Sequence, residues 1–187
     1  MLLIIHIFSG ARKMKQNNIK IRQAQLSDLE LIASIKVAGW QSAYREIVDY
    51  KYLASMSVDK QIEVIKNYSL DTIFVAENDG EVIAFCRFYE YDNPVYEDKE
   101  IDCEIREIYV KPDIKRQGIG SKLFIHTMNY FRHKGKKKLY LGVFKENHNA
   151  RSFYEKMGGN VQGEEDMEVG GKIYPTVSYI FNLSNRK

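Results

Sequence analysis

Hydrophobic and polar positions divide the N-terminal half of the chain into two helices and four strands. Apolar and basic residues alternate over 19–22, which predicts a short strand. Ser27 and Glu30 match a capping box, and a helical stripe of apolar residues starts at Leu29 behind it. Further along, the pattern predicts a helix at 58–68, strands at 72–77 and 81–88 around an Asn-Asp-Gly turn, and a strand from about 102 to 110.

The C-terminal half alternates strands with helices. Apolar residues share one helical face between Leu123 and Phe131, and the predicted helix ends near Gly135. A strand follows at 138–144, then a helix that Asn147 can cap, and then strands at 160–167 and 173–182 around a Gly-Gly turn. The resulting order, β-α-α-β-β-β-α-β-α-β-β, predicts an α/β fold with one mixed sheet and helices on both faces.

Length and composition fit one domain. The chain has 187 residues, of which 44% are hydrophobic and only 3 are proline. Its net charge of +3 is small for a surface built to hold a phosphate backbone, so we expect no nucleic-acid partner. Cys86 and Cys103 form no CxxC, and the histidines have no metal-ligand spacing. We therefore expect no disulfide, no metal and a cytoplasmic location.

The first residues are interpreted separately from the domain. The run from Leu2 to Phe8 is apolar, but it is far shorter than the roughly 20 residues that cross a bilayer. Basic residues follow this run instead of preceding it, which is unlike a signal peptide. We therefore treat 1–13 as an N-terminal extension and 14–187 as one domain, and we expect no association with a membrane.

The segment 104–121 holds the most informative motif. A predicted strand leads into a loop, and the loop opens a helix through Gly118 and Gly120. Amides in the first turn of a helix lack intrahelical partners and can converge on an anion, and Lys115 and Arg116 add positive charge. An ordinary structural turn would show the same glycine pair. Two nucleotide-binding loops are excluded, because no Walker A sequence is present and a Rossmann fingerprint needs a third glycine.

At this segment the sequence resembles the GNAT superfamily, the GCN5-related N-acetyltransferases. The acetyl-CoA loop of that family reads Gln/Arg-x-x-Gly-x-Gly/Ala, and residues 115–120 match it except for lysine at the first position. Residues 108–112 resemble the strand end before that loop, and 147–158 resemble the second cofactor segment. Gly159 departs from the aromatic residue that often follows. The resemblance covers about residues 19–183, and its matching segments in order are more specific than the loop alone.

The resemblance implies a fold and a reaction. The fold is a central, mostly antiparallel twisted sheet of about seven strands, and the reaction is direct transfer of acetyl from acetyl-CoA to a primary amine in a ternary complex. Tyr154 matches the family's general-acid tyrosine, and Glu104, with Glu107 second, is the candidate general base. Trp40 and Tyr44 would line the acceptor pocket. The expected cofactor-binding residues are Ile108, Tyr109, Val110, Lys115, Arg116, Gln117, Gly118, Ile119, Gly120, Ser121, Asn147 and Tyr154.

The chemistry of acetyl transfer needs groups of these kinds. An amine with a pKa near ~10.4 is mostly protonated at neutral pH, and an ammonium cannot attack a thioester, so a base must take a proton. The leaving thiolate needs a donor, which a tyrosine hydroxyl supplies. Strict alternation along a strand sends Glu104 and Glu107 to opposite faces unless a β-bulge intervenes.

Each assignment has a structural alternative. Tyr154 lies on an apolar helical face that also suits the core, both glutamates fit a solvated strand, and Trp40 and Tyr44 would equally cover the sheet. A catalytically silent acyl-CoA sensor is the alternative function, and the basic run 132–138 suits a solvated helix end or a nucleic-acid module. Polyamines, amino acids, aminoglycosides and protein amines stay open as acceptors, although acidic residues at 92–100 hint at a cationic one. A homodimer paired through the C-terminal strands is a further hypothesis.

Overall fold

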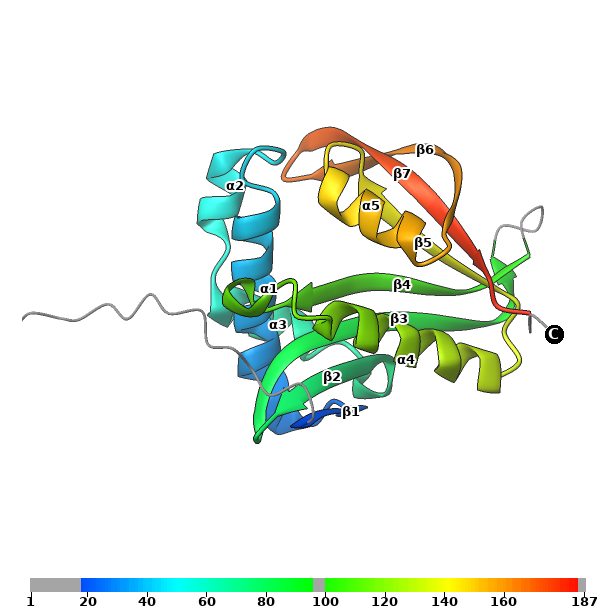
Figure 1. Cartoon of the computed structure of the whole chain (residues 1–187). Helices are drawn as coiled ribbons and strands as arrows, with labels where there is room; N and C mark the ends of the chain where they lie inside the picture. Colours follow the sequence, from blue (N-terminus) through cyan, green and yellow to red (C-terminus); the bar gives the residue numbers. More distant parts are fainter. Residues whose placement is uncertain (1–17, 96–99, 185–187) are drawn as a thin grey trace, which may run out of the picture.

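The computed structural model describes residues 18–95 and 100–184, so the expectation for residues 1–13 lies outside the described residues. The described strands form one seven-stranded sheet in the order β1-β2-β3-β4-β5-β7-β6 (Figure 1). The strands are β1 (Ile19–Gln23), β2 (Ile73–Asn78), β3 (Glu81–Val95), β4 (Ile101–Val110), β5 (Lys138–Phe144), β6 (Asn160–Val169) and β7 (Lys172–Asn182). The helices are α1 (Leu29–Ala43), α2 (Tyr50–Ser55), α3 (Val58–Ile65), α4 (Ile119–His133) and α5 (His148–Lys156).

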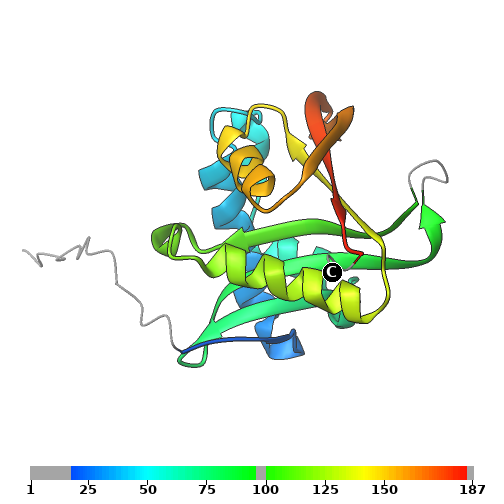
Figure 2. The same cartoon turned by 45° about the vertical axis from the view of Figure 1, so that its right-hand side comes forward.

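Helices cover both faces of this sheet, as the sequence predicts. On one face, buried residues of α4 pack against β2, β3 and β4, and Phe124 and Phe131 are fully covered there. On the other face, α1 and α3 pack against β2 and β3 through Ile32, Ile35 and Ile65 (Figure 2). The expected mixed α/β sheet is therefore confirmed, with every neighbouring pair antiparallel except β4 and β5.

The parallel pair β4 and β5 meets over a very short length. Cys103 pairs with Leu139 and Glu104 pairs with Tyr140, and the pairing of the two strands ends at Glu104. β4 continues to Val110, and in both views the two strands diverge beyond their meeting point (Figures 1 and 2). The divergence splits the sheet between its N-terminal four strands and its C-terminal three.

A β-bulge interrupts β4 beside this opening. Arg87 of β3 pairs with Glu107, but the next residue of β3, Phe88, pairs with Ile105, so Arg106 is an extra residue on β4. The bulge shifts the alternation of side chains by one position. As a result Glu107, which contacts α1 through an ion pair, lies on the same face as Glu104, and the alternative of opposite faces is wrong for this strand.

Two local details differ from the sequence expectation. A 3₁₀ turn at Leu26–Asp28 precedes α1, and the carboxylate of Asp28, not the Ser27 hydroxyl, accepts the nearby amide of Gln25 at 2.8 Å. The expected Ser27–Glu30 capping box is therefore wrong. Asp28, which is buried and also bound by Arg22 at 2.7 Å, takes the capping role in this turn instead. The short helix α2 was not expected either. Its N-cap, Asp49, accepts the amide of Lys51 at 2.8 Å.

The cysteines, the first hairpin turn and the helices add three further observations. Cys86 and Cys103 are buried free thiols. The turn at Asp79 and Gly80 joins β2 to β3, and both residues have positive φ. Among the described helices, none has the length and apolar character needed to span a membrane.

Candidate active site

The loop between β4 and α4 has the backbone shape of an anion site. Arg116 and Gly118 both have left-handed φ, 65° and 78°, and α4 begins at Ile119 without a side-chain cap. The first bond of the helix runs from the amide of Lys122 to the carbonyl of Gly118 at 3.0 Å. The amides of residues 119–121 precede this bond. They lie in the first turn of the helix, where the helix itself offers no carbonyl to accept them. Left-handed strain at a residue such as Arg116 is a feature that clusters at binding sites.

Packing fixes this loop against the end of β4. Ile114 and Ile119 are buried and anchor its two ends in the core. A β-carbon on Gly120 would meet Cγ2 of Val110 at 3.6 Å, which is ordinary contact, so the helix start lies directly on the strand end. Lys115, at the position where the sequence departs from the family pattern, is exposed and donates to Ser42 of α1 at 3.4 Å.

The edge of β4 that faces the opening contributes main-chain groups. Residues 107–110 pair with β3 on one side only, because the register with β5 ends at Glu104. In an antiparallel ladder, alternate residues direct their N–H and C=O groups away from the partner strand. The expected cofactor-binding residues Ile108, Tyr109 and Val110 thus lie on a strand edge that continues to the start of α4.

Tyr154 brings a phenol from α5 to the same region. The side chain is buried, and its ring packs against Phe124, Phe153 and Tyr179 with centroids 5.6, 5.1 and 6.2 Å away. Burial raises the pKa of the phenol well above its usual range, and the nearby Tyr44 and Cys86 add to the shift. Tyr154 also contributes to the raised pKa of Tyr109, so the phenol lies near the part of β4 that borders the opening. Tyr154 is therefore both a core residue and a candidate donor.

Asn147 has a clear structural role. Its Oδ1 accepts the amide of Ala150 at 3.2 Å and caps α5, as the sequence predicts. The amide nitrogen of this side chain has two N–H donors that the cap does not use. The cap fixes the start of α5 and, two turns later, the position of Tyr154.

The two candidate bases have different surroundings. Glu104 is buried, and its carboxylate contacts Nε of Arg106 at 3.3 Å, a side chain that is itself 54% exposed. Glu107 is bound through one oxygen, Oε1, to Lys36 at 2.9 Å and to Arg87 at 3.1 Å. Glu104 sits where β4 and β5 part, since it is the last residue of β4 with a partner on β5. Glu107 lies farther along the unpaired edge.

Two basic residues of this site were missed by the sequence analysis. Lys36 and Arg87 are buried, and each contacts Glu107. The guanidinium of Arg87 also stacks on Tyr68, 4.1 Å from the ring centroid, and donates to the hydroxyl of Tyr89 at 2.5 Å. The only signal in the sequence is a cation within an apolar run, since Arg87 is flanked by Cys86 and Phe88.

Trp40 and Tyr44 lie together at the C-terminal end of α1. Their rings meet edge to face at 4.9 Å, and both contact Phe144 at the end of β5. The indole Nε1 of Trp40 is buried and has no hydrogen-bond partner among the described residues. The hydroxyl of Tyr44 bonds that of Tyr109 at 3.2 Å. The structure therefore brings the two expected acceptor residues beside the strand ends that flank the opening.

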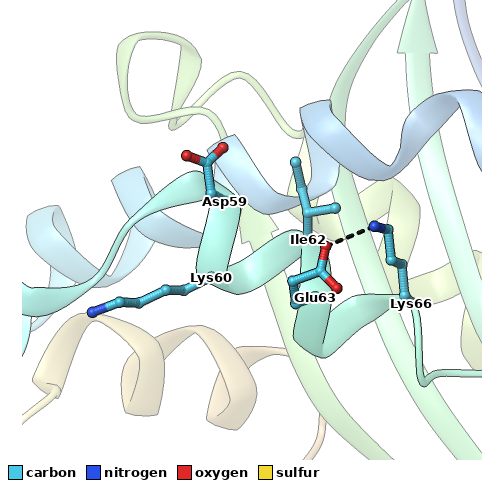
Figure 3. A pocket seen from close by; sticks show the side chains of 5 residues that line it. All are labelled: Asp59, Lys60, Ile62, Glu63 and Lys66. Atoms are coloured by element: carbon cyan, nitrogen blue, oxygen red, sulfur yellow. Dashed lines mark hydrogen bonds and ion pairs between the residues drawn. The ribbon is translucent and has the colours of Figure 1, made fainter.

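Two hollows on the molecular surface lie elsewhere. One is formed by Asp59, Lys60, Ile62, Glu63 and Lys66 on the outer side of α3 (Figure 3). The other lies near the C-terminal ends of α4 and α5, with Met157 and Phe181 in its lining. None of the expected catalytic residues lines either hollow. Within the described ranges, no three residues of the types His, Cys, Asp and Glu are grouped so as to hold a metal ion.

Comparison with known proteins decides the family. The model of the acetyltransferase (GNAT) family matches residues 38–159, which include the C-terminal end of α1, the loop before α4, and α5. The chain belongs to this family. An N-acetyltransferase of Bacillus subtilis, YuaI, which is described as uncharacterised, is 28% identical over 177 residues, covering 90% of this chain and 99% of the relative. Another uncharacterised N-acetyltransferase, from Archaeoglobus fulgidus, is 30% identical over 136 residues. The matched region covers 73% of this chain and 89% of that relative.

A solved structure supports the fold of this acetyltransferase. The PaiA N-acetyltransferase of Thermoplasma acidophilum, in complex with coenzyme A, superposes with a TM-score of 0.62 at 23% identity and covers 85% of this chain and 97% of that one. The resemblance seen in the sequence is thus confirmed, and so is the fold that it implies. Family membership also confirms an enzyme of the N-acetyltransferase class, with acetyl-CoA as co-substrate.

Proposed function

We propose that this acetyltransferase moves acetyl from acetyl-CoA directly to a primary amine of a small molecule or a peptide, with both substrates bound at once. The observation on which this rests is the divergence of β4 from β5 beside the uncapped start of α4, with Tyr154 at the opening. Neither cysteine is suited to a covalent relay, since Cys86 and Cys103 are both buried and burial raises the pKa of each thiol. Direct attack by the amine is the simpler route.

The loop before α4 would hold the diphosphate of acetyl-CoA. The amides of Ile119, Gly120 and Ser121 form the first helical turn, where an anion is favoured by the unpaired N–H groups and by the helix dipole. Open space surrounds the α-carbon of Gly118, because a β-carbon there would meet nothing within 4 Å. The exposed Arg116 adds positive charge. The residues present thus fit an extended dianionic ligand.

The unpaired edge of β4 would hold the pantetheine arm. This arm carries amide groups, and an extended chain with amides can add to a free strand edge as a further strand does. Main-chain groups of Ile108 and Val110 at this edge would pair with the arm and polarise the thioester carbonyl. The arm would then lead from the α4 loop to the phenol of Tyr154.

Tyr154 and Glu104 would divide the proton transfers. The raised pKa of Tyr154 keeps its proton on at neutral pH, so the phenol can donate to the leaving thiolate. Glu104 would take the proton of the amine, directly or through a water. Glu107 suits this role less well, because one of its oxygens already accepts hydrogen bonds from Lys36 and Arg87. Trp40 and Tyr44 would form the apolar wall against which the acceptor packs.

Two measurements on the full chain test this proposal. Saturating acetyl-CoA should raise the melting temperature, because a ligand that binds only the folded state stabilises it. In a screen of grouped amines, acetyl-CoA should be consumed with formation of an acetylated amine by mass spectrometry. A melting temperature that acetyl-CoA does not change would overturn the proposed site. Binding without transfer to any amine would instead support the acyl-CoA sensor.

A further inference from the structure

Lys36, Arg87 and Glu107 form a buried cluster with an excess of one positive charge. Both cations contact the same carboxylate oxygen, at 2.9 and 3.1 Å. The exposed fractions of the three side chains are 9%, 9% and 12%, so water screens the excess charge poorly. The aromatic side chains around the cluster, Tyr68 and Tyr89, supply hydroxyls and ring faces but no negative charge. A buried charge without a counter-charge costs stability, which calls for another reason for its presence.

The cluster also contains two unpartnered polar atoms. Nε of Arg87 is a buried donor and Oε2 of Glu107 a buried acceptor, and neither has a hydrogen-bond partner among the described residues. Buried polar atoms in folded proteins are usually paired, so each such atom needs an explanation. A ligand with an anionic acceptor and an uncharged N–H donor would supply the two missing partners and the missing negative charge.

The position of the cluster connects it to the transfer point. Glu107 is two residues before Tyr109 on β4, a distance of about 7 Å along a strand. The hydroxyl of Tyr109 bonds that of Tyr44, and both tyrosines are within electrostatic reach of Glu107, whose charge raises the pKa of each phenol in addition to the effect of burial. Tyr44 in turn contributes to the pKa of Tyr154. The cluster thus lies on the acceptor side of the site.

We propose that Lys36 and Arg87 bind the carboxylate of the acceptor, and that the acceptor is a free α-amino acid. The inference rests on the proposed function and names the substrate class of that same site. One excess positive charge matches the single carboxylate of an amino acid whose amino group is neutral, which is the form that attacks the thioester, whereas a phosphate dianion would leave the cluster negative. The amino group of the same molecule supplies the donor for Oε2 of Glu107, while Glu104 remains the base. This inference reverses the hint of a cationic acceptor that the acidic residues at 92–100 suggest.

Matched acceptors test the carboxylate directly. The twenty common amino acids are compared with their carboxamides and, where available, with the decarboxylated amines, with kcat/KM for acetyl transfer as the measurement. At least one amino acid should have a kcat/KM about 10-fold or more above that of its carboxamide, because hydrogen bonds to a charged group are the strong ones. Transfer to carboxamides or polyamines but to no amino acid would overturn this inference and leave the proposed function intact.

Variants separate recognition from a purely structural role. Lys36→Met should lower kcat/KM for the preferred amino acid about 10-fold while leaving that for its carboxamide and the KM for acetyl-CoA unchanged. Lys36→Arg keeps the charge and should retain the preference for the amino acid over its carboxamide. This variant still tests the inference if Lys36→Met does not fold. Lys66→Met is the matched control, since that lysine is exposed on the outer side of α3 and pairs with Glu63. Equal losses for amino acid and carboxamide would show a structural cluster and overturn the inference.

If acetyl-CoA neither shifts the melting temperature nor is consumed with any amine, the proposed function itself fails. If acetyl-CoA binds but none of the amino acids is acetylated, only the acceptor class is wrong. The two failures are therefore distinguishable with the same protein preparation.

Discussion

Gly39 of α1 lies directly against the ring of Tyr109 of β4. A β-carbon on Gly39 would be 2.6 Å from Cδ1 of that ring, closer than real β-carbons approach, and 3.1 Å from Cγ, which is also tight. These ring atoms are next to the backbone of Tyr109, so the ring cannot move away by a simple rotation at its far end. The contact fixes the distance between α1 and β4, and through the Tyr109 hydroxyl it also positions Tyr44.

The first prediction is that Gly39→Ala destabilises the protein. Overpacking of this kind costs about 1–3 kcal/mol, and this outweighs the better helix propensity of alanine, which is worth up to about 1 kcal/mol. The melting temperature should therefore fall by several degrees. Gly163→Ala on β6 is the control, because a β-carbon there would meet only Oγ of Ser178 at 3.9 Å. Equal melting temperatures for Gly39→Ala and the parent protein would show that Tyr109 has room to shift.

The second prediction concerns the loop before α4 and uses two glycines with the same backbone conformation. Gly118 has a φ of 78° and Gly135 a φ of 74°, and a β-carbon at either position would meet nothing within 4 Å. Alanine at either position should therefore cost a similar amount, about 1–2 kcal/mol, because the left-handed conformation is unfavourable for residues with a β-carbon. Only Gly118→Ala should also raise the Kd for acetyl-CoA, about 10-fold, since Gly118 is the N-cap of the helix that would hold the diphosphate.

Isothermal titration with acetyl-CoA and thermal melts of both variants check this pair. Gly135→Ala should lose stability and keep its affinity. If Gly118→Ala and Gly135→Ala had the same Kd for acetyl-CoA, the loop would not be the site that binds the diphosphate. A melting temperature lowered in one variant alone would mean that their backbone strain is not comparable.

The third prediction concerns the hydroxyl of Tyr154. Tyr154→Phe keeps the ring and its packing against Phe124 but removes the donor, so kcat should fall about 100-fold or more while the KM for acetyl-CoA stays within a few-fold. Tyr130→Phe is the control. It removes a hydroxyl that bonds Glu90 at 2.6 Å, away from the opening, and it should leave kcat unchanged. An unchanged kcat in Tyr154→Phe would assign this residue to the core alone.

The contrast between expected and observed features has a physical cause. Periodicity depends on neighbours in sequence, so it predicts the strand at 138–144 and the cap at Asn147 correctly. The bulge at Arg106 depends on the register with β3, and no local pattern marks it. The same holds for Lys36 and Glu107, which are 71 positions apart and meet only in the folded chain. The motif residues were thus predictable, whereas the partners that set the chemistry of Glu107 were not.

The fourth prediction concerns acid stability. The hydrogen bonds from Arg22 are the main reason that the pKa of Asp28 lies below its usual range, although burial opposes this. A lowered pKa in the folded state gives stability that is present above the unfolded pKa of about 3.9 and is lost as the pH falls through the folded value. Asp28→Asn should therefore be less stable than the parent protein at pH 6, and this difference should shrink as the pH falls below about 4.

Thermal melts of the parent protein and Asp28→Asn between pH 6 and pH 3 measure this effect. Asp166→Asn, on the exposed face of β6, is the control and should follow the parent protein throughout. A difference between Asp28→Asn and the parent protein that stays constant across this range would show that the Arg22 pair does not act through the charge of Asp28.

The fifth prediction separates the two candidate bases. Glu104→Gln removes the proposed proton acceptor at the point where β4 and β5 part, so kcat should fall about 100-fold at neutral pH. The loss should lessen as the pH rises, because more of the amine is then unprotonated without help. Glu107→Gln should act mainly on the KM of the acceptor, since Glu107 orients Lys36 and Arg87. The measurement is the pH profile of kcat for both variants. If Glu107→Gln showed the pH-dependent loss of kcat and Glu104→Gln did not, the roles of the two glutamates would have to be exchanged.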